Sequence, residues 1–98
     1  MLLDNVKQRL LESKHAIRCN ELGLLLESLG FIVRDGKKGG HKLYIHPDLD
    51  GFHSGSYNCG HGKNPEIKPA SIGQILRVLN TYNAELTEFL RGSDNDEI

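Results

Sequence analysis

The sequence predicts an α+β fold in which a three-stranded antiparallel sheet carries helices on one face. Amphipathic helical patterns lie toward both ends of the chain, short strand patterns lie between them, and glycine-rich segments separate the strands. The 98 residues are 38% hydrophobic and 26% charged, which suits one small globular domain. The expected order is helix, strand, strand, strand, helix (α-β-β-β-α), with one extra N-terminal helix in front.

Two helices are predicted before the strands. Leucine and valine recur at helical spacing over about residues 2–13, which indicates an amphipathic N-terminal helix. A second helix is expected to begin near Asn20, a residue type favoured at N-caps, and to end at Gly30, which suits a C-cap. Its apolar face would consist of Leu22, Leu25, Leu26 and Leu29.

The strands are predicted from short apolar segments bounded by turn residues. Residues 31–34 read as a first strand, 42–46 as its return strand, and about 54–59 as a third strand that its glycines weaken. Side chains alternate between the two faces of a strand. His41, Leu43 and Ile45 would therefore share one face, and Lys42, Tyr44 and His46 the other.

The C-terminal part is predicted to be helical and then disordered. Residues 70–80 form a helical pattern, and 84–90 are expected to add a further turn or two. Residues 93–98 have the composition of a disordered acidic tail. One domain is thus expected over residues 1–92, with its core at about 20–82 and its N-terminal helix at about 2–13.

Charge and cysteine content limit the possible environments. The formal net charge is -1, but Lys14 to Arg77 holds nine Lys or Arg against six Asp or Glu, while the C-terminal segment is acidic. Two cysteines without a hydrophobic N-terminal signal segment predict a reducing, cytoplasmic setting without a disulfide framework. The longest apolar stretches fall short of the roughly 20 residues that span a bilayer, so no membrane partner is expected.

The segment Gly36 to Pro47, GKKGGHKLYIHP, carries residues suited to RNA cleavage. RNA supplies its own nucleophile, the 2′-hydroxyl, so cleavage requires a base, an acid and cations near the phosphate. A histidine titrates near neutral pH and needs no metal for this role, which makes His41 the candidate catalytic residue. Around it, lysines would bind phosphate, glycines would let the RNA backbone approach, and an aromatic ring would stack on a base if its strand face is open: Lys37, Lys38, Lys42, Gly39, Gly40 and Tyr44.

A second group of residues has the side chains of a zinc site: His46, His53, Cys59 and His61. Their spacing matches no common zinc motif, so no metal site is predicted. His61 is instead interpreted as a loop residue near the RNA-binding face. A purely structural role for His41, as a hydrogen-bonded strand histidine, and an ordinary solvated turn over residues 35–40 remain alternatives.

The segments LGFIVRDGKKGGHKLYIHP and HGKNPEIKPASIGQILRVL together resemble the HicA family of toxin mRNA interferases. Members have a fold similar to the double-stranded RNA-binding domain. They share a Leu-Gly-Phe step, a Gly-His signature that carries the catalytic histidine, and a His-Gly loop before the last helix. The matching positions here are Leu29-Gly30-Phe31, Gly39-Gly40-His41 and His61-Gly62, and the resemblance covers roughly residues 20 to 80.

The resemblance implies a toxin of a type II toxin–antitoxin system that cleaves mRNA and is neutralised by a HicB-like antitoxin protein. His41 would act as general base or acid, the product would be a 2′,3′-cyclic phosphate, and no cofactor would take part. Lys42 stands where a second histidine is common in the family. This difference favours an alternative, a non-catalytic RNA-binding module of the same fold. A further alternative is a protein-interaction domain that uses the open face of the sheet.

Overall fold

The computed structural model describes residues 2–12, 16–37, 39–60 and 62–96 of the chain. Its elements are α1 (Leu2–Glu12), α2 (Cys19–Ser28), β1 (Ile32–Asp35), β2 (His41–Ile45), β3 (Gly55–Asn58), α3 (Pro69–Thr81) and α4 (Asn83–Asp96). The strands form one antiparallel sheet in the order β1-β2-β3. The predicted α+β fold, with helices on one side of a three-stranded sheet, is confirmed.

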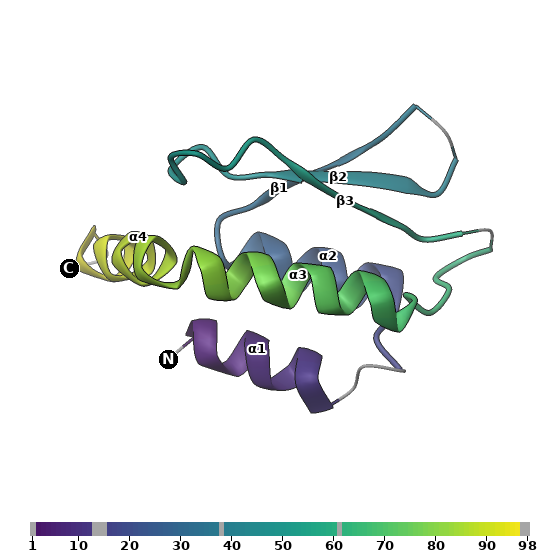
Figure 1. Ribbon diagram of the computed structural model, residues 1–98, viewed down its shortest axis with the longest axis horizontal. Helices are drawn as coiled ribbons and strands as arrows, with labels where there is room; N and C mark the ends of the chain where they lie inside the picture. The colour runs from purple at the N-terminus through teal and green to yellow at the C-terminus, as the bar shows by residue number, and fades with distance from the viewer. Residues whose placement is uncertain (1, 13–15, 38, 61, 97–98) are drawn as a thin grey trace.

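The molecule has three layers (Figure 1). The sheet forms one outer layer, α2 and α3 form the middle layer, and α1 lies on the side of these two helices that faces away from the sheet. The apolar faces of the helices meet the inner face of the sheet in a single core cluster. None of the helices described lies on the other face of the sheet, where Ile32 and Leu43 are 39% and 37% exposed.

Helix α2 begins differently from the prediction. Arg18, not Asn20, occupies the N-cap and makes no side-chain cap. The backbone N–H of Asn20 instead donates to Oδ1 of Asn64, at 2.9 Å. A side chain from a distant loop therefore satisfies a free N–H group of the first helical turn. At the other end the C-cap is Leu29, and the glycine predicted to end the helix, Gly30, follows it with a φ of +94° in the left-handed conformation.

Helix α4 is longer than the sequence indicated. It continues as far as Asp96, so residues 93–96, predicted to be a disordered tail, belong to the helix. Leu86 is fully buried and anchors the helix on the core. Once a helix is nucleated, each further residue costs little because it adds its own backbone hydrogen bond. The composition of residues 93–98, from which disorder was predicted, does not reveal that Leu86 anchors the helix upstream.

A disulfide joins Cys19, the first residue of α2, to Cys59, which directly follows β3. The prediction that the two cysteines form no disulfide is therefore wrong. Forty residues separate them in the sequence, yet the fold brings their Cα atoms to 5.5 Å, within the range that a disulfide spans. No helix in the described part of the chain is long and apolar enough to cross a membrane.

Two core tyrosines should make stability fall at alkaline pH. Burial raises the pKa of Tyr44 and of Tyr57 to about 12, from an ordinary value near 10. Between those values the unfolded chain has lost protons that the folded chain keeps, so unfolding becomes easier as pH rises. We expect the free energy of unfolding to fall by about 1.4 kcal/mol per pH unit for each tyrosine between about pH 10 and 12, and to be insensitive to these groups below pH 10.

Urea denaturation at pH 9, 10 and 11 measures this dependence. Tyr57→Phe removes one of the two ionisable groups and should roughly halve the slope. An equal slope in the parent chain and in this variant would contradict the assignment.

Candidate functional site

His41 begins β2 and lies on the uncovered face of the sheet, grouped with Leu43 as the predicted alternation indicated. Leu43 follows it on the same face, while Tyr44 points into the core. The His41 imidazole is half-buried against Gly36, and a Cβ atom at Gly36 would overlap the ring. The backbone N–H of Gly36 donates to the carbonyl of His41 at 2.7 Å, which closes the turn. The contacts with Gly36 in the β1–β2 turn therefore determine where the His41 imidazole lies.

The His41 ring borders an open hollow of about 520 Å³ that Gly36, Lys37, His41 and Leu43 line. Among the described residues, none forms a side-chain hydrogen bond or ion pair with the imidazole or with the Lys37 ammonium. Both groups are therefore available to a ligand. A histidine and a cation beside one hollow are the groups that phosphodiester cleavage requires.

Two more polar side chains, which were not among the predicted site residues, lie on the same face of the sheet as His41. Asn58 of β3 is the direct register partner of His41. Arg34 of β1 pairs with Leu43, which places it diagonally across from His41. Strand alternation groups Arg34 with Ile32 on one face of β1, and the pairing of β1 with β2 places that face beside His41. The position of Asn58 likewise depends on the pairing of β2 with β3.

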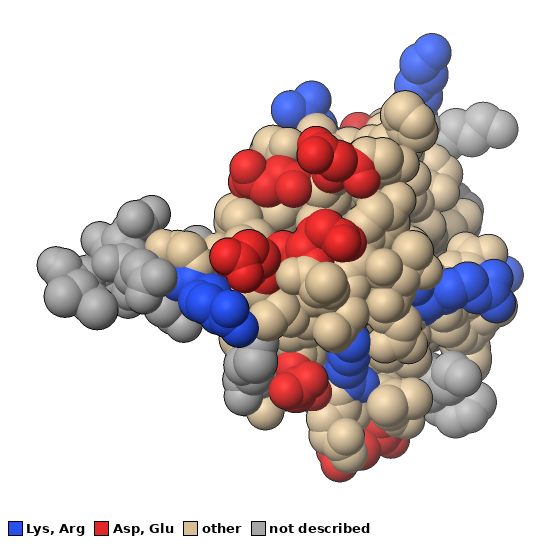
Figure 2. All heavy atoms as spheres, turned by 60° about the vertical axis from the view of Figure 1, so that its left-hand side comes forward, with Lys and Arg blue, Asp and Glu red and all other residues tan. Residues whose placement is uncertain are grey.

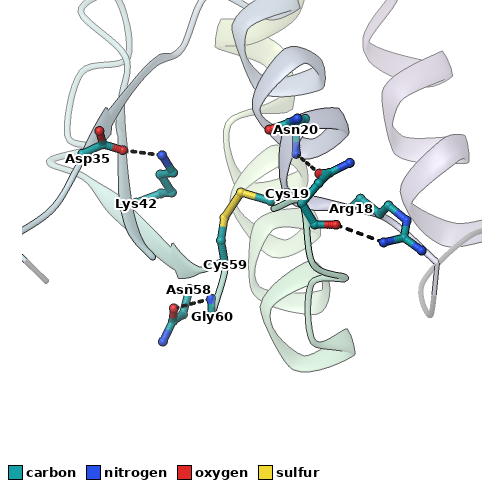
Figure 3. Close-up of a disulfide and its surroundings, with 9 residues drawn as sticks. Arg18, Cys19, Asn20, Asp35, Lys42, Asn58, Cys59 and Gly60 are labelled. Carbon is teal, nitrogen blue, oxygen red and sulfur yellow. Dashed lines mark hydrogen bonds and ion pairs between the residues drawn. A yellow bond between two sulfur atoms is a disulfide. The ribbon is translucent and has the colours of Figure 1, made fainter. Parts of the chain in front are cut away.

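Lys42 lies on the opposite face of β2 from His41. Its ammonium forms an ion pair with Asp35, its register partner on β1, on the side of the sheet where α2 packs (Figure 3). The prediction that Lys42 adds positive charge beside His41 is therefore not supported by its position. The reason is the two-residue period of the strand, which separates neighbouring side chains.

Tyr44 is 2% exposed and packs among Phe31, Phe52 and Tyr57 in the core. The prediction that it stacks on a base is wrong, because its face of the sheet is the covered one.

The two glycines before His41 differ in their surroundings. Gly40 has a φ of +81°, and a Cβ atom there would overlap the carbonyl oxygen of Gly60. It is therefore required for the close approach of the two chain segments. A Cβ atom at Gly39 would meet nothing within 4 Å, so the backbone there is open to a ligand. Lys38 and His61, two other predicted RNA-binding residues, lie outside the described residues.

Two of the residues considered for zinc, His46 and Cys59, use their ligand atoms in other contacts. His46 is 4% exposed, its Nε2–H donates to the Leu29 carbonyl at 3.0 Å, and its Nδ1 accepts from the Asp48 N–H at 3.2 Å. These two contacts fix the neutral tautomer that carries its proton on Nε2. Cys59 is in the disulfide, and His53 is exposed. His46 and Cys59 therefore have no free ligand atom for a metal.

Charge is divided between the two ends of the molecule. The β1–β2 turn with Lys37 and the loop with Lys63 lie at one end, and α4 lies at the other (Figure 1). Figure 2 brings the α4 end forward and shows acidic side chains gathered on it. Asp48, Glu85 and Glu88 line a hollow there together with Phe89. A polyanion would therefore be repelled from the α4 end and attracted to the end that holds His41.

A larger hollow, of about 840 Å³, runs along the outer side of α3. Its lining contains one ionisable side chain, Arg77, among small and amide residues: Ala70, Gly73, Gln74, Leu76, Asn80 and Thr81. It offers no acid–base pair, so the smaller hollow beside His41 is the better candidate for chemistry.

Comparisons of this chain with models of protein families, with curated proteins and with solved structures give no match.

Proposed function

We propose that this protein is a HicA-like toxin, an endoribonuclease that cleaves mRNA at the His41 site. The observation that carries the proposal is the position of His41: exposed to a hollow on the uncovered sheet face, without a side-chain partner among the described residues, and beside Lys37. The order of the Leu-Gly-Phe, Gly-Gly-His and His-Gly motifs supports the same conclusion.

In the proposed reaction His41 accepts the proton of a ribose 2′-hydroxyl while the 2′-oxygen attacks the adjacent phosphorus. The bond from phosphorus to the 5′-oxygen breaks, and that oxygen takes up a proton as it leaves. The products are a 2′,3′-cyclic phosphate and a 5′-hydroxyl end. Lys37 and Arg34 stabilise the negative charge that develops on the phosphate oxygens.

An RNA cleavage assay tests the proposal directly. The purified chain is incubated with a mixed-sequence RNA in the presence of EDTA, and the ends of the fragments are analysed. Fragments that end in 2′,3′-cyclic phosphate are the expected result. RNA binding without cleavage would favour the non-catalytic RNA-binding module, and absence of both would exclude RNA as the ligand of this site.

The open sheet face also supports a protein partner. Ile32 and Leu43 are exposed and Ile45 is half-buried on this face, so it offers apolar contact area beside the catalytic histidine. In the proposed system this partner is a HicB-like antitoxin that covers the site. Expression of the chain alone should arrest growth, and co-expression with the product of a neighbouring antitoxin gene should prevent the arrest. A protein-interaction domain without nuclease activity would cause no arrest that depends on His41.

The salt dependence of RNA binding should distinguish the two faces of the sheet. If Lys37 meets a phosphate, Lys37→Gln should reduce the slope of log affinity against log salt concentration by about 0.7, the value for one contact to a single strand. Lys42→Gln is the matched comparison, because Lys42 lies on the other face and pairs with Asp35. Titrations at several salt concentrations measure both slopes. An effect of Lys42→Gln as large as that of Lys37→Gln would place the RNA elsewhere.

A further inference from the structure

The Cys19–Cys59 disulfide joins the middle helical layer to the end of the sheet at which β2 begins (Figure 3). Cys19 starts α2, and Cys59 directly follows Asn58, the last residue of β3. Asn58 is the register partner of His41. The covalent link is therefore one residue away from the strand position that faces the candidate catalytic histidine.

The backbone of Cys59 also forms a hydrogen bond with Gly40, the residue that precedes His41. The N–H of Cys59 donates to the carbonyl of Gly40 at 2.6 Å. Next to it, the N–H of Gly60 donates to Oδ1 of Asn58 at 2.8 Å. Gly40 lies so close to Gly60 that a Cβ atom at Gly40 would overlap the Gly60 carbonyl oxygen. We call residues 40, 41 and 58–60, with these contacts, the His41 corner.

The disulfide lies close to the surface of the molecule, next to a hollow that a small molecule can enter. Both cysteines, which are 9% and 5% exposed, line a hollow of about 410 Å³ at the surface. Its other lining residues include Lys63, Lys42, whose ammonium is paired with Asp35, and no acidic side chain; the rest are Asn20, Gly40, Gly60, Gly62, Asn64 and Pro65. Thiol–disulfide exchange needs a thiolate that can approach one of the sulfur atoms, and cationic surroundings favour thiolates over thiols.

Outside the His41 corner, buried apolar side chains hold the helices together in addition to the disulfide. Leu22, Leu26 and Leu29 of the α2 segment are fully buried in the core. Helix α3 contributes Ile72, Ile75 and Leu79, which are also fully buried. Because these contacts do not involve the cysteines, we expect them to persist when the disulfide is opened. The His41 corner, in contrast, lies at the end of the sheet beside a glycine-rich loop and has few buried apolar side chains of its own.

We propose that the Cys19–Cys59 disulfide is a thiol–disulfide exchange site through which a small dithiol controls the order of the His41 corner. One thiolate of the dithiol attacks a cysteine sulfur, the protein S–S bond breaks, and the other cysteine leaves as a thiolate that takes up a proton. The second thiol of the reagent then displaces the first cysteine and closes a cyclic disulfide. The protein gains two electrons and two protons, and the dithiol loses them.

In the oxidised chain the corner is held and His41 is in place, whereas in the reduced chain the corner opens. This change in the order of the corner does not depend on which reaction the protein catalyses. Its consequence for RNA cleavage rests on the proposed function.

Hydrogen exchange followed by NMR, with and without dithiothreitol, tests the proposal on the full chain. Reduction should accelerate exchange of the Cys59 and Gly60 amides by about tenfold or more, because both donate hydrogen bonds within the corner. Amides of α3 around Ile75 should change by less than about twofold. Unchanged rates at Cys59 and Gly60 would overturn the proposal. An equal acceleration throughout α3 would also overturn it, because the link would then hold the whole fold.

Three variants serve as controls. The double variant Cys19→Ser, Cys59→Ser should show the exchange pattern of the reduced chain and no response to dithiothreitol. Gly40→Ala should open the corner even in the oxidised chain, because a Cβ atom there overlaps Gly60. Gly39→Ala adds the same methyl group where nothing lies within 4 Å and should leave the exchange rates of the oxidised chain unchanged.

RNA cleavage by the same samples separates the two proposals. Loss of cleavage on reduction, and its return on re-oxidation, is the expected result. Cleavage that is equal in both forms, together with faster exchange, would show that the corner does not control the site. Accelerated exchange in a chain that cleaves RNA in neither form would contradict the proposed function and leave the exchange site intact.

Discussion

His41→Ala is expected to reduce the rate of RNA cleavage by about 100- to 10,000-fold, the usual contribution of a general acid or base. The loss of activity should not come from unfolding. The imidazole lies on the uncovered face of the sheet and forms no side-chain hydrogen bond with the described residues, so its removal leaves no buried polar group without a partner. Initial cleavage rates and thermal melting of the parent and the variant measure the two effects separately.

Gly36→Ala provides a graded test of the same site. The new Cβ atom would overlap the His41 ring, so the imidazole must move while its chemistry remains intact. We expect a clear fall in rate that is smaller than the loss in His41→Ala, since misplacement of a catalytic group costs rate steeply. Gly73→Ala, on α3 and outside the His41 site, is the matched control, because the added methyl group there also meets nothing within 4 Å. A His41→Ala variant that cleaves at the parent rate would remove His41 from the mechanism.

The second large effect is expected for stability and concerns His46. His46→Ala should lower the free energy of unfolding by about 3 kcal/mol, because it removes two hydrogen bonds and leaves a cavity in the core. The ring packs edge-on against Phe31 and Phe89, with centroid distances of 4.9 and 4.7 Å. Without it the carbonyl of Leu29 and the N–H of Asp48 lose their partner.

For a domain of this size such a loss lowers the melting temperature by on the order of 15 °C. His53→Ala is the matched control, because His53 is exposed and its replacement should change stability by less than about 0.5 kcal/mol. Thermal melts of both variants and of the parent chain make the comparison. A stable His46→Ala variant would show that the buried contacts of the ring contribute little.

Strand β2 shows how far the sequence determines the candidate site. The two-residue period of a strand places His41 with Leu43 and separates both from Tyr44 and His46, whatever the rest of the chain does. That grouping is confirmed. The choice of the buried face is not local, because Tyr44 and Leu43 are both large and mostly apolar. The choice follows from α2 and α3, which pack on the Tyr44 side and leave Leu43 uncovered.

By itself, the sequence determined the fold class, the α1, α2 and α3 helices, and the glycine-rich turn before His41. These features depend on periodicity and on turn residues within one segment, and such local preferences need no knowledge of distant neighbours. Only the tertiary structure decided which residues meet His41, and it paired Cys19 with Cys59 across forty residues and capped α2 with Asn64. Contacts of this kind arise when packing of the whole chain brings remote segments together, so no local sequence pattern predicts them.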